Sequence, residues 1–243
     1  MRMAAFAKRV SKEILRDPLN LFFGICFSPV LMLLMSAIGA NVPVEQFQIE
    51  RLAPGIAVFG LSFMTLFSAT LISKDRCGSL LQRLYTTPLL PTDFILGYVL
   101  PMIPMAIAQG GVCYALALIL GLPCSVNILW AVILMIPISL LFISLGLLCG
   151  SALNDKAVGG VCGALLTNLC AWLSGAWFDL ALVGGAFRKV AYALPFVHAV
   201  ELERAVLKGD LGGIFPHLWW VLGYAALIFI LAVFAFFRQM KRQ

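Results

Sequence analysis

The side chains that could do chemistry in this 243-residue chain do not form a recognisable catalytic or metal-binding set. Neither histidine, His198 or His217, stands near a cysteine cluster, and the seven cysteines contain no Cys-x-x-Cys pair. A zinc site and a disulfide framework are therefore not indicated. No Gly-x-Ser-x-Gly motif is present, and no pair of carboxylates falls within an apolar run. The sequence predicts no catalytic residue and no metal site, and it disfavours a membrane-embedded enzyme.

A phosphate-binding loop is also missing from the sequence. Proteins that use ATP directly often cradle its phosphates with Gly-x-x-x-x-Gly-Lys-Ser/Thr, and this chain contains no Gly-Lys pair. We therefore expect no cofactor in this chain. If ATP drives the protein, a separate ATPase chain must hold the ATP and its Mg²⁺.

The elements around these few reactive residues are membrane spans. The chain is 62% hydrophobic and 12% charged, with a mean hydropathy of +1.02, whereas soluble domains are about a quarter charged. No charged residue occurs in six runs, namely residues 19–40, 53–73, 94–120, 127–150, 157–178 and 216–237. Each run can cross a hydrocarbon core, which takes roughly 20 apolar residues. Because the runs do not alternate polar and apolar residues, they predict helices and not barrel strands. We expect an all-α polytopic membrane protein with six transmembrane helices in a single domain over residues 1–243.

Basic residues indicate how the spans are oriented. With six spans both termini share one side of the membrane. That side would carry most of the 17 Lys and Arg residues: Arg2, Lys8, Arg9, Lys12, Arg16, Lys74, Arg76, Arg83, Lys156, Arg238, Lys241 and Arg242. Because cytoplasmic flanks are enriched in Lys and Arg, both termini are predicted to be cytoplasmic. The net charge of +6 is then a topology signal, and no aromatic-interleaved basic patch indicates nucleic-acid binding.

Residues 1–18 predict an amphipathic helix on the cytoplasmic face. Lys8, Lys12 and Arg16 form one basic row at four-residue spacing, and an apolar row that includes Phe6 and Val10 forms another. This pattern suits an interfacial helix beside anionic membrane lipid, although a solvated basic flank would also set the topology. The apolar run that follows, residues 19–40, is longer than the 7–15 residues of a signal-peptide core, which favours a retained span.

The segment before the last span, residues 179–215, is external yet largely apolar. Its apolar pieces are too short to cross a membrane, and they are interrupted at Gly184-Gly185 and at Leu194-Pro195. Such segments are typically re-entrant or interfacial. We therefore predict a re-entrant external helix pair at this place.

The cytoplasmic loop over residues 74–92 predicts a short amphipathic helix. Cys77, Leu80 or Leu81, and Leu84 share one face, and Thr87-Pro88 stops the helix. An apolar face of this kind can insert into a groove on a partner protein. An ordinary surface helix between two spans explains the periodicity equally well.

The residues of this loop resemble a known family. Asp75-Arg76, Gly78, Arg83-Leu84 and Thr87-Pro88-Leu89, followed by Phe94, Gly97 and Pro101, are similar to the second cytoplasmic segment of ABC-2 type transporter permeases. Late in the chain, residues 173–178 and 190–201 resemble a second motif of that family. The order of six spans, basic N-terminal helix and apolar external segment agrees with the family over the whole chain. Many members carry an acidic residue two positions before the loop glycine, where this chain has Arg76.

The resemblance implies the membrane subunit of a bacterial-type ABC exporter in the plasma (inner) membrane. Two permeases, as a homodimer or a heterodimer with a paralogue, would work with two cytoplasmic ABC ATPase subunits. The loop helix would dock in a cleft of the ATPase. The residues expected to couple the two subunits are Lys74, Asp75, Arg76, Leu80, Leu81 and Leu84. The uncharged spans suit an amphipathic, lipid-like, glycan or drug-like substrate.

Two features of the spans leave alternatives open. Small residues recur every four positions in the fifth span: Gly159, Gly163, Thr167, Ala171 and Gly175. Such a face allows close helix approach, either within one subunit or as a subunit-interface or pathway face. The amides Asn168 and Gln109 predict interhelical links or contacts with the transport pathway.

Functions without ATP remain as alternatives. An ATP-independent channel, a secondary transporter or a scaffold would also consist of six spans. Ion-coupled transporters usually place an ionisable group inside a span, and no span interior here contains one, which disfavours that class.

Overall fold

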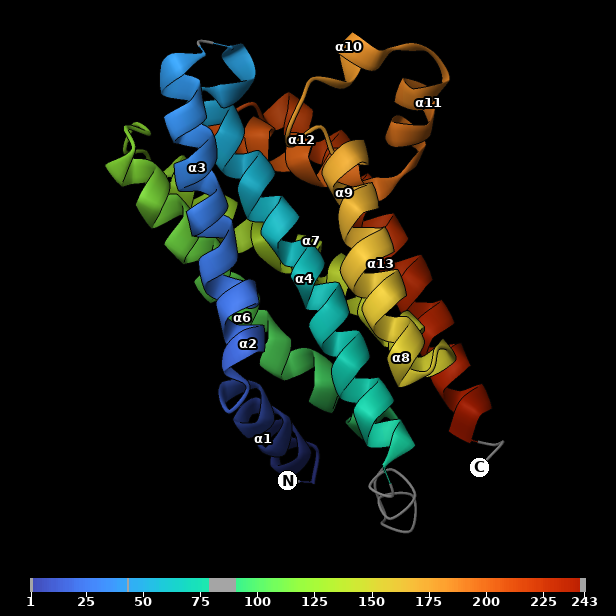
Figure 1. The fold of residues 1–243 in the computed structure, drawn as a ribbon. Coiled ribbons are helices and arrows are strands. Elements are labelled where there is room, and N and C mark those ends of the chain that lie inside the picture. Colours follow the sequence, from blue (N-terminus) through green and yellow to red (C-terminus); the bar gives the residue numbers. More distant parts are fainter. Residues whose placement is uncertain (1, 43, 79–90, 241–243) are drawn as a thin grey trace.

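The computed structural model describes residues 2–42, 44–78 and 91–240, and every regular element in these ranges is helical (Figure 1). Six helical stretches are long and apolar enough to cross a membrane: Pro18–Asn41, Ile49–Cys77, Thr92–Ile119, Asn127–Ala152, Asp155–Leu173 and Leu211–Arg238. The predicted all-α fold with six spans is confirmed.

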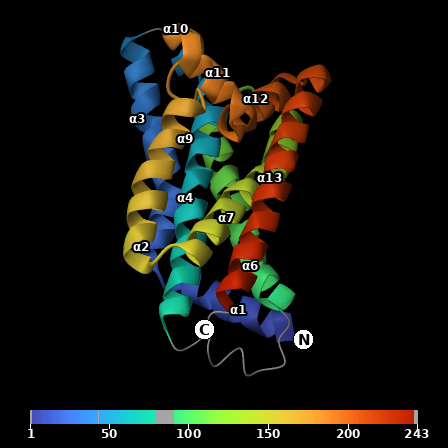
Figure 2. The same cartoon turned by 90° about the vertical axis from the view of Figure 1, so that its right-hand side faces the viewer.

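The N-terminal helix α1 (Arg2–Leu15) lies across one end of the bundle (Figure 2). Its apolar row is buried against protein, since Phe6 and Val10 are almost inaccessible. Asp17 follows the helix and caps α2 (Pro18–Leu21), because its carboxylate accepts the backbone N–H of Asn20 and Pro18 occupies the first helical turn. The N-terminal helix, predicted over residues 1–18, therefore ends at Leu15, shortly before Pro18.

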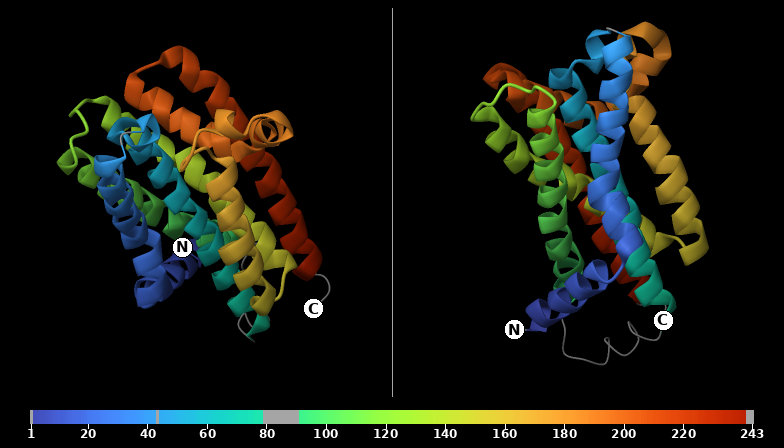
Figure 3. Two further views of the ribbon diagram at one scale, coloured as in Figure 1. Left: turned by 45° about the horizontal axis from the view of Figure 1, so that its top comes forward. Right: turned by 60° about the vertical axis from the view of Figure 1, so that its left-hand side comes forward.

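The first span continues from α2 through a π-helical turn, η1 (Phe22–Cys26), into α3 (Phe27–Asn41). A short 3-10 turn, η2 (Glu45–Phe47), leads into α4 (Ile49–Cys77). Most of α4 is buried, because α3, α6 (Pro91–Ile119), α7 (Asn127–Ala152) and the fifth span pack around it (Figures 1 and 3).

Glycine permits the close approach of α7 to α4. A Cβ atom on Gly146 would lie 2.4 Å from the carbonyl oxygen of Thr65, and one on Gly150 would lie 2.7 Å from that of Ala69. Thr65 donates a hydrogen bond of 2.9 Å to the carbonyl oxygen of Phe142 across the same contact. These two helices therefore form a backbone-to-backbone contact that larger residues would separate.

The fifth span consists of α8 (Asp155–Val158), the π-helical segment η3 (Gly159–Leu166) and α9 (Thr167–Leu173). It ends at Leu173, five residues before the end expected from the apolar run. Gly175 has a φ of 69°, a left-handed conformation that glycine adopts readily and that stops the helix.

The last part of the chain forms a cap and the sixth span. The helices are α10 (Leu180–Val183), α11 (Gly185–Ala193), α12 (Pro195–Lys208) and α13 (Leu211–Met240). The breaks expected at Gly184-Gly185 and Leu194-Pro195 are confirmed, since each separates two helices. The predicted helix pair is therefore α11 and α12, with a single extra turn before it. Their re-entrant path into the bilayer stays a prediction.

The two ends of the bundle differ in what they carry. One end, called the α1 end here, holds α1 and the C-terminal ends of α4 and α13 (Figure 1). The opposite end, called the α12 end, holds α10, α11, α12 and the α6–α7 turn (Figure 1).

Candidate functional site

The C-terminal end of α4 is held by a buried charge pair. Asp75 is 5% exposed, and both its oxygens accept hydrogen bonds from Arg9 of α1, at 2.6 and 2.7 Å. The hydroxyl of Tyr98 on α6 donates to the same carboxylate at 2.8 Å. These hydrogen bonds raise the pKa of Arg9 above its ordinary value. A two-pronged, charge-assisted contact of this type fixes both position and orientation.

Aromatic packing adds to this contact between α1 and α6. The ring of Phe6 meets Phe94 and Tyr98 edge-to-face, with centroids 5.5 and 5.1 Å apart. The ring lies where a Cβ atom on Gly97 would approach it to 2.3 Å. Gly97, one of the residues that carried the family resemblance, therefore makes room for the N-terminal helix.

The other side of the α4 end is tied to the α7–α8 turn. The guanidinium of Arg76 donates to the backbone carbonyls of Ser151 and Leu153, at the end of α7. Ser73 donates to a carboxylate oxygen of Asp155 in α8 at 3.0 Å. The end of α4 is thus linked to four other elements: α1, α6, α7 and α8.

The six residues predicted to couple to an ATPase are placed as follows. Asp75 and Arg76 face other helices of this chain, while the side chain of Lys74 is exposed. Leu80, Leu81 and Leu84 lie outside the described residues. A force applied to the loop that follows α4 would reach α1 and α6 through Asp75, and α7 through Arg76. It would reach α8 through Ser73.

Sequence reasoning missed Arg9 and Tyr98 as partners of Asp75. Arg9 was grouped with basic residues that set the topology, and Tyr98 stands beside the glycine of the motif. The pairing joins residues 66 positions apart, and no local spacing encodes it. The one available signal was Arg9 itself, which falls off the row of Lys8, Lys12 and Arg16.

The small residues of the fifth span do not form one continuous face. Gly163 packs on Leu66 of α4, with a Cβ position 3.4 Å away, and Thr167 is buried. Ala171 is half-buried, and Gly159 has no neighbouring atom within 4 Å of its Cβ position among the described residues. Gly163 and Thr167 therefore pack toward α4 or the interior, whereas Gly159 is exposed on the surface of the single chain.

Gly175 has a different role from the other members of that series. It lies beyond α9, and its carbonyl oxygen accepts hydrogen bonds from Gln46 at 2.9 Å and from Arg204 of α12 at 3.0 Å. The helix end is thus anchored to η2 and to α12.

The two amides of the spans also differ. Gln109 of α6 donates to the carbonyl oxygen of Ala57 in α4 at 3.2 Å, an interhelical link, which was one of the two alternatives for this amide. Asn168 is exposed and donates to Ala164 of its own span at 2.8 Å. An exposed amide in a membrane span has no water to bond, so its surface is suited to a protein contact.

A buried carboxylate at the α12 end was not anticipated. Glu203 of α12 is 0% exposed, and one oxygen accepts a hydrogen bond of 2.6 Å from Tyr114 of α6. Burial raises the pKa of Glu203 to about 8, while the hydrogen bond from Tyr114 opposes the rise. The sequence placed this residue in an external segment of mixed polarity, where burial cannot be read from periodicity.

The described residues contain no cluster of three or more histidine, cysteine or acidic side chains that would suit a metal ion. The arrangement instead joins several helices of the bundle at one end, through the side chains of the last turns of α4. The sequence model of the family described as "ABC-2 type transporter" matches residues 2–207, which run from the start of α1 to the last turn of α12. Among curated proteins, none matches this chain.

Proposed function

The chain belongs to the ABC-2 type transporter family, and we propose that it is the membrane subunit of an ATP-driven exporter. As a permease of this family it is a transport subunit and not itself catalytic. The proposal adds that ATP is hydrolysed by a separate cytoplasmic subunit. It is supported by the absence of a phosphate-binding loop in the sequence.

The observation that carries the proposal is the set of contacts at the end of α4. The loop after α4 resembles the segment by which the family contacts its ATPase. Asp75 and Arg76 lie in the last turn of α4, immediately before this loop. Both residues bind neighbouring helices through charge-assisted hydrogen bonds. In the proposed mechanism, closure of the ATPase moves the loop. Asp75 carries the movement to α1 and α6, Arg76 to α7, and Ser73 to α8.

A second permease completes the proposed exporter. The fifth span exposes Gly160, Ala164 and Asn168 at four-residue spacing. Small residues permit close approach of helices in lipid, and Asn168 gains a polar partner there. A change in the contact between two such faces would alternately open the pathway to each side of the membrane.

The direction and location of transport follow from the same proposal. The α1 end carries most of the basic residues, so we place it in the cytoplasm of a bacterial cell, with the α12 end outside the inner membrane. The spans expose apolar surface, which suits an amphipathic, lipid-like, glycan or drug-like cargo taken from the cytoplasm or inner leaflet.

The test replaces the apolar face of the loop with a charge. Leu84→Asp would bury an unpaired carboxylate in the ATPase cleft, at a cost of several kcal/mol. We expect the protein to insert normally, to lose co-purifying ATPase and to lose export.

Leu182→Asp serves as the matched control. Leu182 is an exposed leucine of α10 at the opposite end of the bundle, so the same substitution there should leave the ATPase bound. Normal export and normal ATPase binding by Leu84→Asp would refute coupling through this face.

A further inference from the structure

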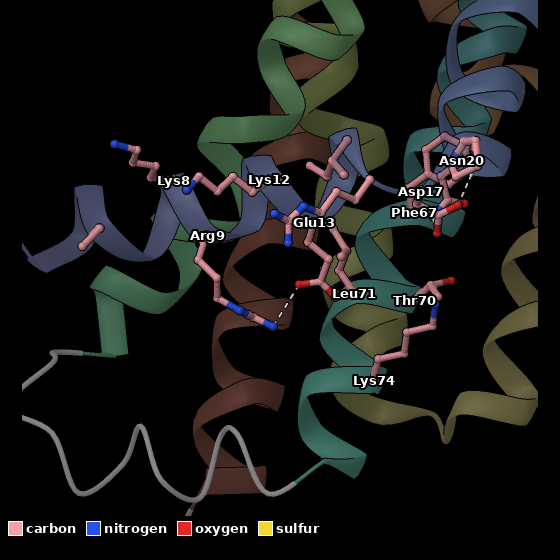
Figure 4. Close-up of a pocket in the computed structure, with 14 residues that line it drawn as sticks. Lys8, Arg9, Lys12, Glu13, Asp17, Asn20, Phe67, Thr70, Leu71 and Lys74 are labelled. Carbon is pink, nitrogen blue, oxygen red and sulfur yellow. Dashed lines mark hydrogen bonds and ion pairs between the residues drawn. The ribbon is translucent and has the colours of Figure 1, made fainter.

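Two cavities meet at the N-terminal helix. One is a basic cavity of about 780 Å³ between α1, the α1–α2 corner and α4 (Figure 4). The other is an apolar groove of about 420 Å³ between α1, the first span and α6. Lys8 and Ile14 line both, so the two spaces are adjacent along α1.

The basic cavity has an excess of positive charge. Its cationic side chains are Lys8, Arg9, Lys12, Arg16 and Lys74. Its two acids are already engaged, since Glu13 pairs with Arg9 at 2.9 Å and Asp17 accepts from Asn20 at 2.7 Å. Within the described ranges, the side chains of Lys8, Lys12, Arg16 and Lys74 have no ion-pair or hydrogen-bond partner. Four unpaired cations around one cavity favour an anionic ligand.

The neighbouring groove is suited to a hydrocarbon chain. Apart from Lys8 and Ser11, only apolar residues line it, including Leu15, Leu21, Ile25, Leu100, Pro101 and Met105. Leu15 is 69% exposed at its rim. The groove runs along Leu21 and Ile25 at the start of the first span and along residues 100–108 of α6, on the side of the bundle that faces the cytoplasmic leaflet under the orientation given above. An exposed leucine beside unpaired lysines is the pattern of an interfacial helix.

We propose that the α1 end binds one anionic phospholipid of the surrounding leaflet. One acyl chain occupies the apolar groove, and the headgroup phosphate lies between Lys8 and Lys12. This lipid is a resident of the site and not the transported cargo. A soluble phosphate would use the cations but leave the groove empty, and a protein surface would not supply a single alkyl chain.

The site has a consequence for the contacts of α4. Arg9, one residue from Lys8, holds Asp75 at the end of α4. A lipid that fixes α1 therefore stabilises the Arg9–Asp75 contact as well. The inference depends on membrane insertion and not on ATP coupling, so it can fail while the proposed exporter function stands.

The test measures lipid binding to the purified full-length chain in detergent by native mass spectrometry. The probes are dioleoylphosphatidylglycerol, dioleoylphosphatidylcholine and inorganic phosphate. Each basic residue near an anionic lipid surface strengthens binding about fivefold. The double variant Lys8→Gln/Lys12→Gln should thus bind phosphatidylglycerol about 30-fold more weakly. Lys156→Gln, which removes an exposed lysine that lines neither cavity, should change binding less than about twofold.

A second variant tests the groove. Ala108 is exposed and lines it, so Ala108→Trp should displace the acyl chain and reduce binding of both lipids without altering any charge. Equal binding of phosphatidylglycerol by the wild type and both variants would overturn the proposal. Equal binding of phosphatidylglycerol and phosphatidylcholine by the wild type would also overturn it, because the two headgroups share a phosphate and differ in net charge.

A competition experiment distinguishes a lipid headgroup from a soluble phosphate as the ligand of the basic cavity. Inorganic phosphate should displace the lipid only at concentrations that screen charge in general. Displacement at equimolar phosphate would assign the cavity to a soluble anion. Loss of a co-purifying protein from the Lys8→Gln/Lys12→Gln variant, with lipid binding unchanged, would assign it to a protein partner and refute the lipid site.

Discussion

At the scale of single residues, Asp75 has the most demanding environment at the α1 end. Its carboxylate is buried, so it depends on Arg9 and Tyr98 to replace the water it has lost. The guanidinium of Arg9 also pairs with Glu13, whose side chain is 35% exposed, whereas that of Asp75 is 6% exposed. The two carboxylates therefore offer a matched comparison of a buried and a partly exposed ion pair.

We expect Asp75→Asn to destabilise the protein and Glu13→Gln to have little effect. Hydrogen bonds to charged groups contribute about 1.5–3 kcal/mol each, whereas exposed ion pairs contribute less than about 1 kcal/mol. For a chain of this size, 1 kcal/mol shifts the unfolding midpoint by about 2–4 °C. Thermal unfolding in detergent should show a midpoint lowered by at least about 3 °C for Asp75→Asn only. Equal midpoints for the two variants would mean that the Arg9–Asp75 pair does not hold α1.

Glu203 gives stability a pH dependence at the opposite end of the bundle. Its pKa in the folded protein is raised to about 8, above the ordinary value of 4.5, so the folded state binds the extra proton between these values. The contribution of Glu203 to the free energy of unfolding is fully present below about pH 4.5, and it is lost as the pH rises through about 8. Glu203→Gln keeps an acceptor for Tyr114 without a charge.

We predict that Glu203→Gln raises the unfolding midpoint at pH 9 by a few degrees and flattens its dependence between pH 6 and 9. Circular dichroism melts at a series of pH values provide the measurement. Glu201→Gln, in the same helix but half-buried beside Arg204, is the control and should keep the wild-type slope. A steep slope that persists in Glu203→Gln would assign the titration to another group.

At the scale of elements, α7 packs closely on α4, the helix whose last turn holds residues proposed to couple to an ATPase. This contact depends on Gly146, whose Cβ position is 2.4 Å from a carbonyl oxygen of α4. A rigid backbone atom cannot move aside as a flexible side chain can, so the two helices must separate to admit a methyl group.

Gly146→Ala should therefore destabilise the bundle by about 1–3 kcal/mol, despite the better helix propensity of alanine. Gly223→Ala is the control. Gly223 lies within α13 with no atom within 4 Å of its Cβ position among the described residues, so alanine there should be neutral or stabilising by up to about 1 kcal/mol. Parallel thermal melts compare them, and a neutral Gly146→Ala would show that the α4–α7 contact is looser than described.

The elements also show which features the sequence could predict. Charge-free runs located all six spans, and Gly184-Gly185 and Leu194-Pro195 located helix ends, because these signals are local in the chain. The π-helical turns in η1 and η3 carry no such local signal. They lie where the chain packs on distant elements, η1 on α4 and α6, and η3 on α4. The early end of the fifth span depends on Gly175, whose carbonyl is held by residues far away in sequence.

The candidate site was predictable only in part, for the same reason. The resemblance selected Lys74, Asp75 and Arg76, but the inward orientation of Asp75 and Arg76 depends on Arg9, Tyr98 and the end of α7. Leu80, Leu81 and Leu84 stay predictions from the sequence. Burial of Glu203 arises where α12 packs across the bundle, which no periodicity within α12 reveals.

At the scale of the whole molecule, the two ends of the bundle should face different compartments. Cys77 is exposed at the α1 end, and Cys124 is exposed in the α6–α7 turn at the α12 end (Figure 1). In intact cells, a membrane-impermeant thiol reagent should label a variant that retains only Cys124. It should label a variant that retains only Cys77 only after the membrane is opened. Labelling of Cys77 alone in intact cells would reverse the orientation.

The same two cysteines test the central claim, that the loop after α4 contacts an ATPase. In native membranes, a maleimide–benzophenone reagent attached to the variant that retains only Cys77 should cross-link it, on irradiation, to a separate chain through that chain's C–H bonds. Mass spectrometry should find a Gly-x-x-x-x-Gly-Lys-Ser/Thr loop in that chain. The variant that retains only Cys124 should give no such product. A nucleotide-binding chain captured from Cys77 and not from Cys124 is the result we predict. Export that proceeds in membranes where neither cysteine captures such a chain would contradict ATP-driven coupling through the end of α4.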